Sequence, residues 1–301
     1  MPASDARISV CAGIVCHNAD PARLRRLISS CIDSVDRVLV FDNASRNAAE
    51  LRQAVATTPH LSWQQSPHNI GLAAAYNQLA KQARRSGASH LLLFDQDSLC
   101  EAGMVERLIA VDGQLRSLGI SPGLVGPLYL DRKHQRRPQL PQRQTDRLPR
   151  AVQAVDFTIS SGSLIGLDAY TVVGEFMEPL FIQYIDIEWG FRAWACGRPC
   201  FVVEDAVLQH DIGDSLVKLP LLNRRIPRHS AERGYYFCRN LLALCRLRYI
   251  PLRWKVREVG RTLAKLMIQP ILFGQAASRL GHMLAGLRDG LRRIGGPRRS
   301  G

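Results

Sequence analysis

The segment that most constrains the fold is a short apolar run, His90-Leu-Leu-Leu-Phe-Asp-Gln-Asp-Ser98, which ends in two carboxylates. The run Leu-Leu-Leu-Phe is too short for a helix core, but it suits a strand buried on both faces of a parallel sheet. Ligands of open α/β sheets bind beyond the carboxyl ends of the strands, where Asp95 and Asp97 would lie. Such hard oxygen ligands suit Mg²⁺ or Mn²⁺ that carries substrate phosphates. The alternative is a turn in which Asp97 and Ser98 cap a helix over 101–118.

Strand-like and helix-like segments alternate along the first two thirds of the chain, which predicts an α/β fold with a mostly parallel sheet flanked by helices. The expected strands are 8–16, 37–42, 61–65, 90–95, 157–166 and 200–208. The expected helices are 21–32, 48–56, 71–85 and 185–196. Residues 131–150, which are rich in Arg, Gln and Pro, suggest a polar loop.

The charge is distributed unevenly along the chain. Residues 1–220 carry 22 Lys and Arg against 23 Asp and Glu, whereas residues 221–301 carry 18 against 3. We therefore expect a main α/β domain over 1–234 and a basic, amphipathic helical appendage over 235–301. Its apolar side chains recur at helical spacing, at Val256, Val259, Leu263, Leu266 and Met267, and then at Leu280, Leu284, Leu287, Leu291 and Ile294.

This basic appendage predicts binding to an anionic membrane surface, because cationic amphipathic helices lie in the headgroup region of such membranes. The alternative is that these helices pack on the main domain and expose ordinary solvated arginines. No apolar run reaches the about 18 residues of a membrane-spanning helix, and the N-terminus lacks signal-peptide features. The eight cysteines form no Cys-x-x-Cys pair, which argues against a zinc or redox motif.

Polar residues gather where the predicted strands end. Each one alone is an ordinary turn former, or in the case of His210 a surface histidine, but one parallel sheet would bring them all to the same edge. They are Asn18, Asp42, Asn43, Asn69, Gly71, Asp95, Asp97 and His210.

With these residues in view, the chain resembles family 2 glycosyltransferases of the GT-A fold, and most closely their bacterial rhamnosyltransferase branch. The resemblance runs from about residue 8 to residue 240. It is carried by His17-Asn18, Phe41-Asp-Asn-Ala-Ser45, Asn69-Ile-Gly-Leu-Ala-Ala-Ala-Tyr-Asn77, Asp95-Gln-Asp-Ser98, Ser161-Gly-Ser163, Phe181-Ile-Gln-Tyr-Ile-Asp-Ile-Glu-Trp-Gly-Phe-Arg192, His210 and Arg239-Asn240.

The resemblance implies a role for each motif. Asp42 would bind the pyrimidine base of a nucleotide sugar, and Asp97 with His210 would bind the Mg²⁺ or Mn²⁺ on its diphosphate. The remaining residues of the nucleotide-sugar site would be Asn18, Asn43, Asn69, Gly71, Leu72, Asn77, Asp95 and Gln96. On the acceptor side the resemblance implies Gly162, Glu188, Trp189, Arg239 and Asn240.

Asp186 would be the general base, because sugar transfer with inversion needs a carboxylate opposite the leaving group. Glu188 is the rival base, but helical spacing turns the two residues about 200° apart, so both should not enter one site. The alternative is that both acids only stabilise the start of a helix. One departure from the family pattern is His17, which stands where many relatives have tyrosine.

The sequence thus predicts an inverting glycosyltransferase that moves L-rhamnose from dTDP-L-rhamnose to a glycan or lipid-linked glycan acceptor in bacterial cell-surface polysaccharide synthesis. We expect a cytoplasmic protein on the inner face of the cell membrane, without a nucleic-acid partner, and a homo-oligomer stays open. Other donors, such as a galactofuranosyl or glucosyl nucleotide, are the nearest alternative. From other classes, a haloacid-dehalogenase-type phosphatase would also use Asp-x-Asp, and the high isoelectric point would suit a nucleic-acid-binding protein.

Overall fold

The computed structural model describes residues 8–131, 142–143, 145, 148–210, 215–218, 225–228, 230–272 and 276–298. The chain forms two compact units. The first comprises Met1–Phe176 and Trp189–Asp211, and the second comprises Met177–Glu188 and Ile212–Gly301. This division differs from the boundary expected after residue 234, because a segment from the middle of the chain groups with the C-terminal helices.

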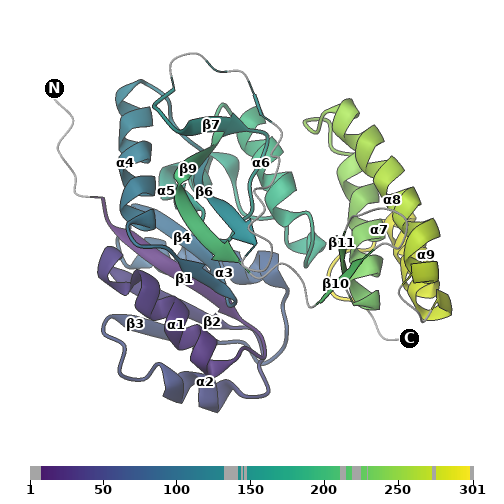
Figure 1. Cartoon of the computed structure of the whole chain (residues 1–301), viewed down its shortest axis with the longest axis horizontal. Helices are drawn as coiled ribbons and strands as arrows, with labels where there is room; N and C mark the ends of the chain where they lie inside the picture. The colour runs from purple at the N-terminus through teal and green to yellow at the C-terminus, as the bar shows by residue number, and fades with distance from the viewer. Residues whose placement is uncertain are drawn as a thin grey trace. The chain divides into compact units, whose positions relative to one another are not determined.

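The first unit is built on one sheet, which has nine strands in the described part of the chain (Figure 1). The strand order is β3-β2-β1-β4-β8-β6-β9-β5, and β7 pairs with β9. The strands are β1 (Val10–Cys16), β2 (Arg37–Asp42), β3 (Leu61–Gln65), β4 (His90–Asp95), β5 (Ser98–Cys100), β6 (Leu124–Asp131), β7 (Val152–Val155), β8 (Leu164–Gly166) and β9 (Cys200–His210).

The sheet is mostly parallel. Strands β1, β2, β3, β4, β6 and β9 run in one direction, and β5, β7 and β8 run against them. The expected α/β architecture is therefore confirmed. The strand expected at 157–166 is only the short antiparallel β8, at its last three residues, and the parallel strand β6 was not predicted.

Both faces of the sheet are buried, as continuous apolar strands require. On one face, Ile14 of β1 belongs to a core cluster that includes Leu27 of α1 (Pro21–Cys31) and Leu108 of α4 (Met104–Ser117). On the other face, Gly13 lies against Leu79 of α3 (Leu72–Arg85), and a Cβ atom at Gly13 would come within 3.1 Å of the Leu79 Cδ1 atom.

Local sequence sets where these helices begin. Asp20 caps α1, since its carboxylate accepts the backbone N–H of Ala22 at 2.8 Å and of Arg23 at 3.2 Å. Gln96 and Asp97 form a turn, but helix α4 starts after Gly103 and Ser98 belongs to β5, so the alternative that Asp97 and Ser98 cap this helix is wrong. The remaining helices of this unit are α2 (Ala48–Ala54), α5 (Leu167–Val173) and most of α6 (Ile185–Ala195).

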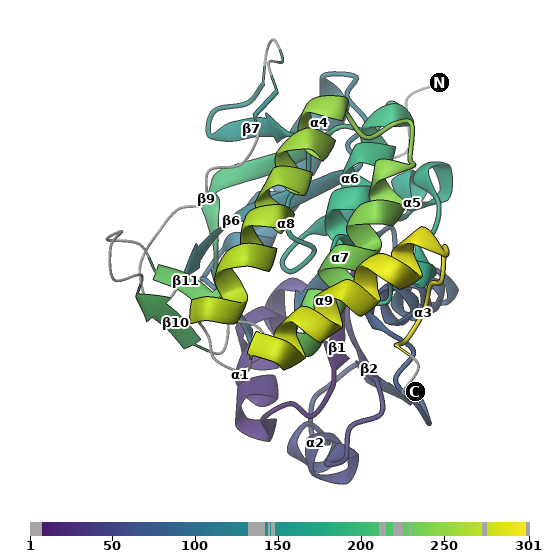
Figure 2. The same ribbon diagram turned by 90° about the vertical axis from the view of Figure 1, so that its right-hand side faces the viewer.

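In its described residues, the second unit contains the antiparallel strand pair β10 (Ser215–Lys218) and β11 (Arg225–Arg228), and three complete helices (Figure 2). These are α7 (Ala231–Cys245), α8 (Leu252–Leu272) and α9 (Ala276–Leu291). Helix α9 packs closely on α7 because it presents Gly286 and Gly290, where a Cβ atom would meet the Tyr235 oxygen at 2.2 Å and the Arg239 oxygen at 2.9 Å. The 3₁₀ turn η2 (Glu178–Leu180) also belongs to this unit.

None of the helices in the described residues is long and apolar enough to cross a membrane. The expected polar loop at 131–150 lies mostly outside the described residues.

Candidate active site

The polar residues predicted at the strand ends do lie at one edge of the sheet. In the parallel register, Cys16 of β1 lies beside Asp42 of β2, and Val15 lies beside Asp95 of β4. The residues that follow these strands therefore leave the sheet from the same edge, as expected for a ligand site in an open α/β sheet. We call this set of strand-end residues in the first unit the rim.

Hydrogen bonds join the chain segments that follow β1, β2 and β4. The His17 N–H donates to the Gln96 Oε1 atom at 2.8 Å, and the His17 Nδ1 atom lies 2.8 Å from the Asn43 carbonyl oxygen. Asn18 has a positive φ of 51°, and its side-chain oxygen accepts the Arg46 N–H at 2.9 Å. Three of the predicted nucleotide-site residues, Asn18, Asn43 and Gln96, thus hold the rim together.

A second group of bonds fixes the turn that leads into α3. The Asn43 amide donates to the Asn69 Oδ1 atom at 2.9 Å, and this same oxygen accepts the Gly71 N–H at 2.9 Å. Gly71 has a φ of 86°, which strongly favours glycine, and it directly precedes Leu72, the first residue of α3. Gly71 therefore presents backbone without a side chain at the rim.

Asp42 is buried, and only one of its carboxylate oxygens has a hydrogen-bond partner among the described residues. The Oδ1 atom accepts the Ser45 N–H at 3.2 Å, and the Oδ2 atom is without a partner. Leaving a buried acceptor unpaired costs about 1–3 kcal/mol, more for a charged group. Such an oxygen is suited to accept an N–H group of a ligand, provided that the side chains covering it move aside.

Asp95 is half-buried at the end of β4 and is fixed by residues that the sequence reasoning missed. Its carboxylate accepts the Tyr76 hydroxyl at 2.9 Å, and its N–H donates to the Ser161 Oγ atom at 3.0 Å. Gly162 follows in the left-handed region, with a φ of 77°, and its N–H donates to the Leu93 oxygen at 2.7 Å. Tyr76 and Ser161 both lie inside motifs of the family pattern, so the signal was present but gave no role.

Asp97 and His210, the expected metal ligands, come close together through strand pairing. Ser98 of β5 pairs with His210 of β9, and Asp97 immediately precedes Ser98. Mg²⁺ and Mn²⁺ sites that carry phosphates need only one or two protein ligands, so this donor set fits such an ion. The side chain of His210 lies outside the described part of the structure.

The same pairing reveals a further acidic position at the rim. Asp131 ends β6, which runs parallel to β9, and its Cα partner there is His210. The sequence signal was the apolar strand Leu124–Leu130 that ends in a carboxylate, which is the pattern that identified Asp95. Asp131 was missed because the basic segment that follows it was interpreted as the start of a loop.

Asn77 has a different position from the one expected. It is buried in α3, where its side-chain oxygen accepts the Tyr170 hydroxyl at 2.7 Å and the Phe176 N–H at 2.9 Å. Its amide donates to the Phe176 carbonyl oxygen at 3.0 Å. These bonds favour a supporting role for Asn77, and direct contact with the nucleotide stays a prediction.

The two rival bases lie in very different environments at the start of α6. Asp186 is half-buried, and its carboxylate accepts the N–H of Ile187 at 2.9 Å. Glu188 is fully buried and accepts a hydrogen bond from the Tyr249 hydroxyl. Because a fully buried carboxylate cannot reach an acceptor hydroxyl, this difference favours Asp186 as the base.

The segment before Asp186 has an unusual backbone. Phe181, Gln183 and Tyr184 have φ values of 62°, 70° and 65°, a region that costs non-glycine residues energy. Asn240 of α7 holds this segment, since its amide donates to the carbonyl oxygens of Leu180 at 2.9 Å, Ile182 at 2.7 Å and Gln183 at 3.0 Å.

Arg239 completes this arrangement, which we call the Arg239–Asn240 clamp. Its guanidinium is buried and donates to the carbonyl oxygens of Pro179 at 2.9 Å, Leu180 at 2.8 Å and Gly296. Burial lowers the pKa of Arg239, and the nearby tyrosine rings of α7 partly offset this effect. Both clamp residues were expected on the acceptor side, and their burial favours positioning over direct contact.

Trp189 was also expected on the acceptor side. It is fully buried in the first unit, and its indole N–H donates to the Gly174 carbonyl oxygen at 3.0 Å. It therefore packs the core of that unit.

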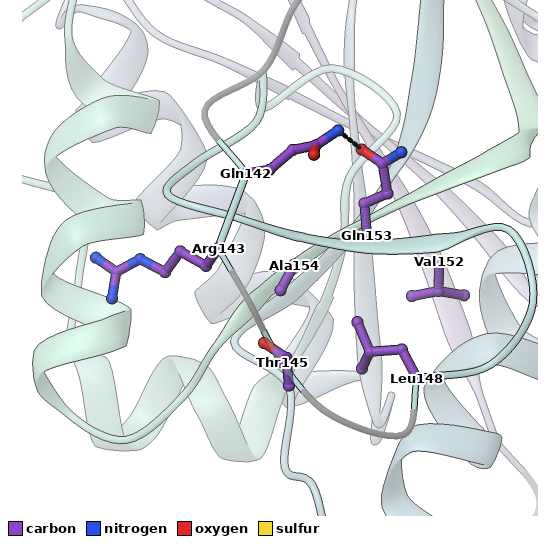
Figure 3. A pocket seen from close by; sticks show the side chains of 7 residues that line it. All are labelled: Gln142, Arg143, Thr145, Leu148, Val152, Gln153 and Ala154. Carbon is purple, nitrogen blue, oxygen red and sulfur yellow. Dashed lines mark hydrogen bonds between the residues drawn. The ribbon is translucent and has the colours of Figure 1, made fainter.

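A cavity of about 460 Å³ lies away from the rim (Figure 3). Its lining residues include Arg143, Leu148 and Gln153, and the Gln142 and Gln153 side chains are hydrogen-bonded at its edge. Gln153 of β7 pairs with Val202, near the amino end of β9, whereas the rim lies at the carboxyl end of that strand. This cavity is therefore separate from the rim.

Comparisons with known proteins agree with this geometry. The family described as glycosyl transferase family 2 matches residues 11–164, which contain all the rim residues from Asn18 to Asp97. The dTDP-rhamnosyl transferase RfbF of Shigella flexneri is 28% identical over 301 residues, which cover 96% of this chain and 97% of that protein.

Two solved structures resemble the fold. GalNAc-T7, crystallised with UDP, GalNAc and Mn²⁺, has a TM-score of 0.57 at 13% identity and covers 96% of this chain. S. aureus TarS has a TM-score of 0.61 at 13% identity and covers 95% of this chain. This chain spans only 57% and 49% of those two proteins, so the likeness concerns the architecture, which is GT-A.

Proposed function

Since the chain belongs to glycosyl transferase family 2 and has the GT-A fold, we propose that this glycosyltransferase moves L-rhamnose from dTDP-L-rhamnose to a glycan or lipid-linked glycan, with inversion. The observation that carries the proposal is the end-to-end similarity to a dTDP-rhamnosyl transferase, at 28% identity over 96% of the chain. Family membership makes the phosphatase alternative wrong as an account of the activity, whereas the comparisons do not address nucleic-acid binding.

The donor nucleotide binds at the rim in this proposal. Asp42 accepts a hydrogen bond from the pyrimidine base, and the support is its buried Oδ2 atom, which lacks a partner among the described residues. Asn18, Asn43 and Gln96 shape the pocket, because their mutual bonds fix the three strand ends around Asp42. The backbone at Asn69–Leu72 approaches the sugar-phosphate side.

Asp97 and His210 would hold the divalent cation, Mg²⁺ or Mn²⁺, that the donor diphosphate needs. Such a cation would neutralise the negative charge that develops on the leaving group. The β5–β9 pairing that brings the two residues together supports this assignment. GalNAc-T7, a neighbour in fold, was crystallised with Mn²⁺. Asp95, held by Tyr76, lies on the sugar side of this pair.

Asp186 removes the proton from the acceptor hydroxyl. A general base contributes about 10²–10⁴-fold to a rate, and a carboxylate must be accessible to do so. Asp186 meets this condition and the buried Glu188 does not. The Arg239–Asn240 clamp supports the segment that leads into Asp186, while Gly162 and Trp189 support the rim and the core behind it.

The experiment that tests this proposal is transfer of labelled rhamnose from dTDP-L-rhamnose, with Mn²⁺, into a lipid extract of bacterial membranes. We expect Asp186→Asn to lower transfer at least about 100-fold and to leave the donor dissociation constant within about twofold. Glu178→Gln, which changes an exposed acid nearby, is the control and should transfer like the parent. Transfer at the parent rate by Asp186→Asn would overturn the base assignment, and transfer from a UDP-sugar alone would discard rhamnose.

A further inference from the structure

Helix α8 has two faces with opposite character. Its outer face carries an unbroken stripe of exposed apolar side chains, at Leu252, Val256, Val259, Leu263 and Met267. These positions are spaced by four, three, four and four residues, so they share one side of the helix. Leu263 is 55% exposed and Met267 is 75% exposed, which is unusual for large apolar side chains in neighbouring turns.

Helix α9, which contacts α8 in the same unit, repeats this pattern. Leu280, Leu284 and Leu291 are exposed, whereas Met283, Gly286 and Gly290 face the protein. These exposed side chains therefore do not form the contact between the helices of the second unit. That contact uses the opposite side of each helix.

The net charge around the stripes is positive. Exposed arginines flank them, at Arg253 and Arg257 on α8 and at Arg288 and Arg292 at the end of α9. Glu258 of α8 is buried against Tyr184, whereas Asp289 of α9 forms an ion pair with Arg288 and offsets its charge. The net positive charge beside the stripes therefore comes from Arg253, Arg257 and Arg292. An apolar stripe beside basic side chains is complementary to a lipid surface whose headgroups are anionic.

We propose that the outer face of α8 and α9 docks on an anionic lipid bilayer, and that α8 thereby ties membrane binding to the segment that carries Asp186. The docking stands on the exposed stripes and the arginines, whereas the role of Asp186 rests on the proposed function.

The inner face of α8 supplies the link. The Tyr184 hydroxyl donates to the Glu258 Oε1 atom at 2.9 Å, and the Tyr184 ring packs edge-on against Trp254, with 6.0 Å between ring centroids. Glu258 and Trp254 lie on the side of α8 opposite the apolar stripe, and both are buried. Tyr184, with its positive φ, stands two residues before Asp186. A bilayer that immobilises α8 therefore also immobilises the backbone in front of the proposed base.

The docking is tested with the full chain by co-sedimentation with vesicles of phosphatidylglycerol and phosphatidylcholine, against vesicles of phosphatidylcholine alone. We expect binding to the anionic vesicles only, weakened at least tenfold by the double substitution Leu263→Asp and Met267→Asp. Val172→Asp is the matched control, because Val172 is an apolar residue with 50% exposure on α5, and it should bind like the parent.

Three results would overturn the docking. They are failure of the parent to bind anionic vesicles, equal binding of the double variant, and a stable dimer of the parent that the double variant dissociates. The last result would make the face a contact between two copies. Point variants are preferred to deletion of 251–301, because that deletion removes α9 from α7 and the Gly296 oxygen from Arg239.

The link is tested by hydrogen exchange of the amides of 178–187, with and without the anionic vesicles. We expect these amides to exchange more slowly when the parent is bound. Tyr184→Phe, which removes the hydroxyl that donates to Glu258, should still bind the vesicles but should lose most of this slowing, and slowing that persists in Tyr184→Phe would refute the link. Neither readout uses a nucleotide sugar, so failure of the proposed glycosyl transfer would be seen separately.

Discussion

Asn240 makes three hydrogen bonds that hold the backbone before Asp186, and Asn240→Ala removes all of them. The Leu180 oxygen keeps its bond from Arg239, so the oxygens of Ile182 and Gln183 are the ones that lose their donor. An unpaired buried carbonyl costs about 1–3 kcal/mol, and because these two carbonyls are only partly buried we take the lower half of that range, which gives a loss of about 3 kcal/mol for the pair.

This loss must be compared with the strain in the segment. Phe181, Gln183 and Tyr184 lie at positive φ, and such conformations cost non-glycine residues about 1 kcal/mol or more each, hence about 3 kcal/mol together. The two quantities are similar. We therefore expect the segment to relax in Asn240→Ala, while the rest of the unit stays folded through the packing of α7 on α9.

If a loss of about 3 kcal/mol fell entirely on the active arrangement, turnover would drop by about 100-fold, since each 1.36 kcal/mol is tenfold. The assay is rhamnosyl transfer at saturating donor, with urea unfolding and donor binding measured on the same protein. We expect turnover to fall about 10- to 100-fold, and the donor dissociation constant to change little because the rim belongs to the first unit.

Leu244→Ala is the matched control for this experiment. Leu244 is fully buried on the same helix, and its truncation should lower the free energy of unfolding by about 2–5 kcal/mol. It leaves the clamp bonds in place, so turnover of the folded protein should stay close to the parent value. If Asn240→Ala lowers the free energy of unfolding but the folded variant still transfers rhamnose at the parent rate, the reasoning is refuted.

Two further predictions concern stability. A Cβ atom at Gly286 would lie 2.2 Å from the Tyr235 oxygen, so Gly286→Val should force α9 away from α7 and sharply lower the urea concentration at which half the protein unfolds. Gly281→Ala should not lower this midpoint, because a Cβ atom at Gly281 would have nothing within 4 Å. Burial alone would raise the pKa of Asp112, but hydrogen bonds, first from His90, outweigh it and lower that pKa. Its stabilisation is therefore complete above the unfolded value of about 3.9 and is lost as the pH falls through the lower folded value. As the pH is lowered, the free energy of unfolding should fall less in Asp112→Asn than in the parent protein. Equal falls would contradict the stabilising role given to Asp112.

The rim was predictable because it depends on strand ends. Apolar runs that stop at Asp42 and Asp95 determine where parallel strands leave the sheet, and the parallel register then brings those ends together. The turn at Asn69–Gly71 was likewise visible, since glycine before a helical pattern marks a change of backbone direction.

The rest depended on tertiary contacts that no local pattern reveals. Asn77 and Asn240 are polar residues in helices, and nothing nearby in the sequence indicates that their partners lie on segments far along the chain. The positive φ values of Phe181 and Tyr184 were also hidden, because bulky residues rarely adopt them and local propensity argues against them.

Lys265 shows the same limit on the basic helices. The sequence places it on the polar side of α8, where a solvated lysine is expected. In the structure its ammonium lies 4.4 Å from the centroid of the Phe237 ring, and burial lowers its pKa. It is thus a packing residue of the helix bundle, and the charge available to a membrane comes from the exposed arginines.

The most direct test of the central claim is calorimetric titration of the protein with dTDP-L-rhamnose, dTDP-glucose and UDP-galactofuranose, each with Mn²⁺ and with EDTA. We predict that dTDP-L-rhamnose binds most tightly, that Mn²⁺ strengthens this binding at least tenfold, and that Asp97→Asn removes the strengthening by Mn²⁺. Tighter binding of another donor would contradict the assignment of rhamnose. Binding of dTDP-L-rhamnose that is equal with Mn²⁺ and with EDTA would contradict the role given to Asp97 and His210.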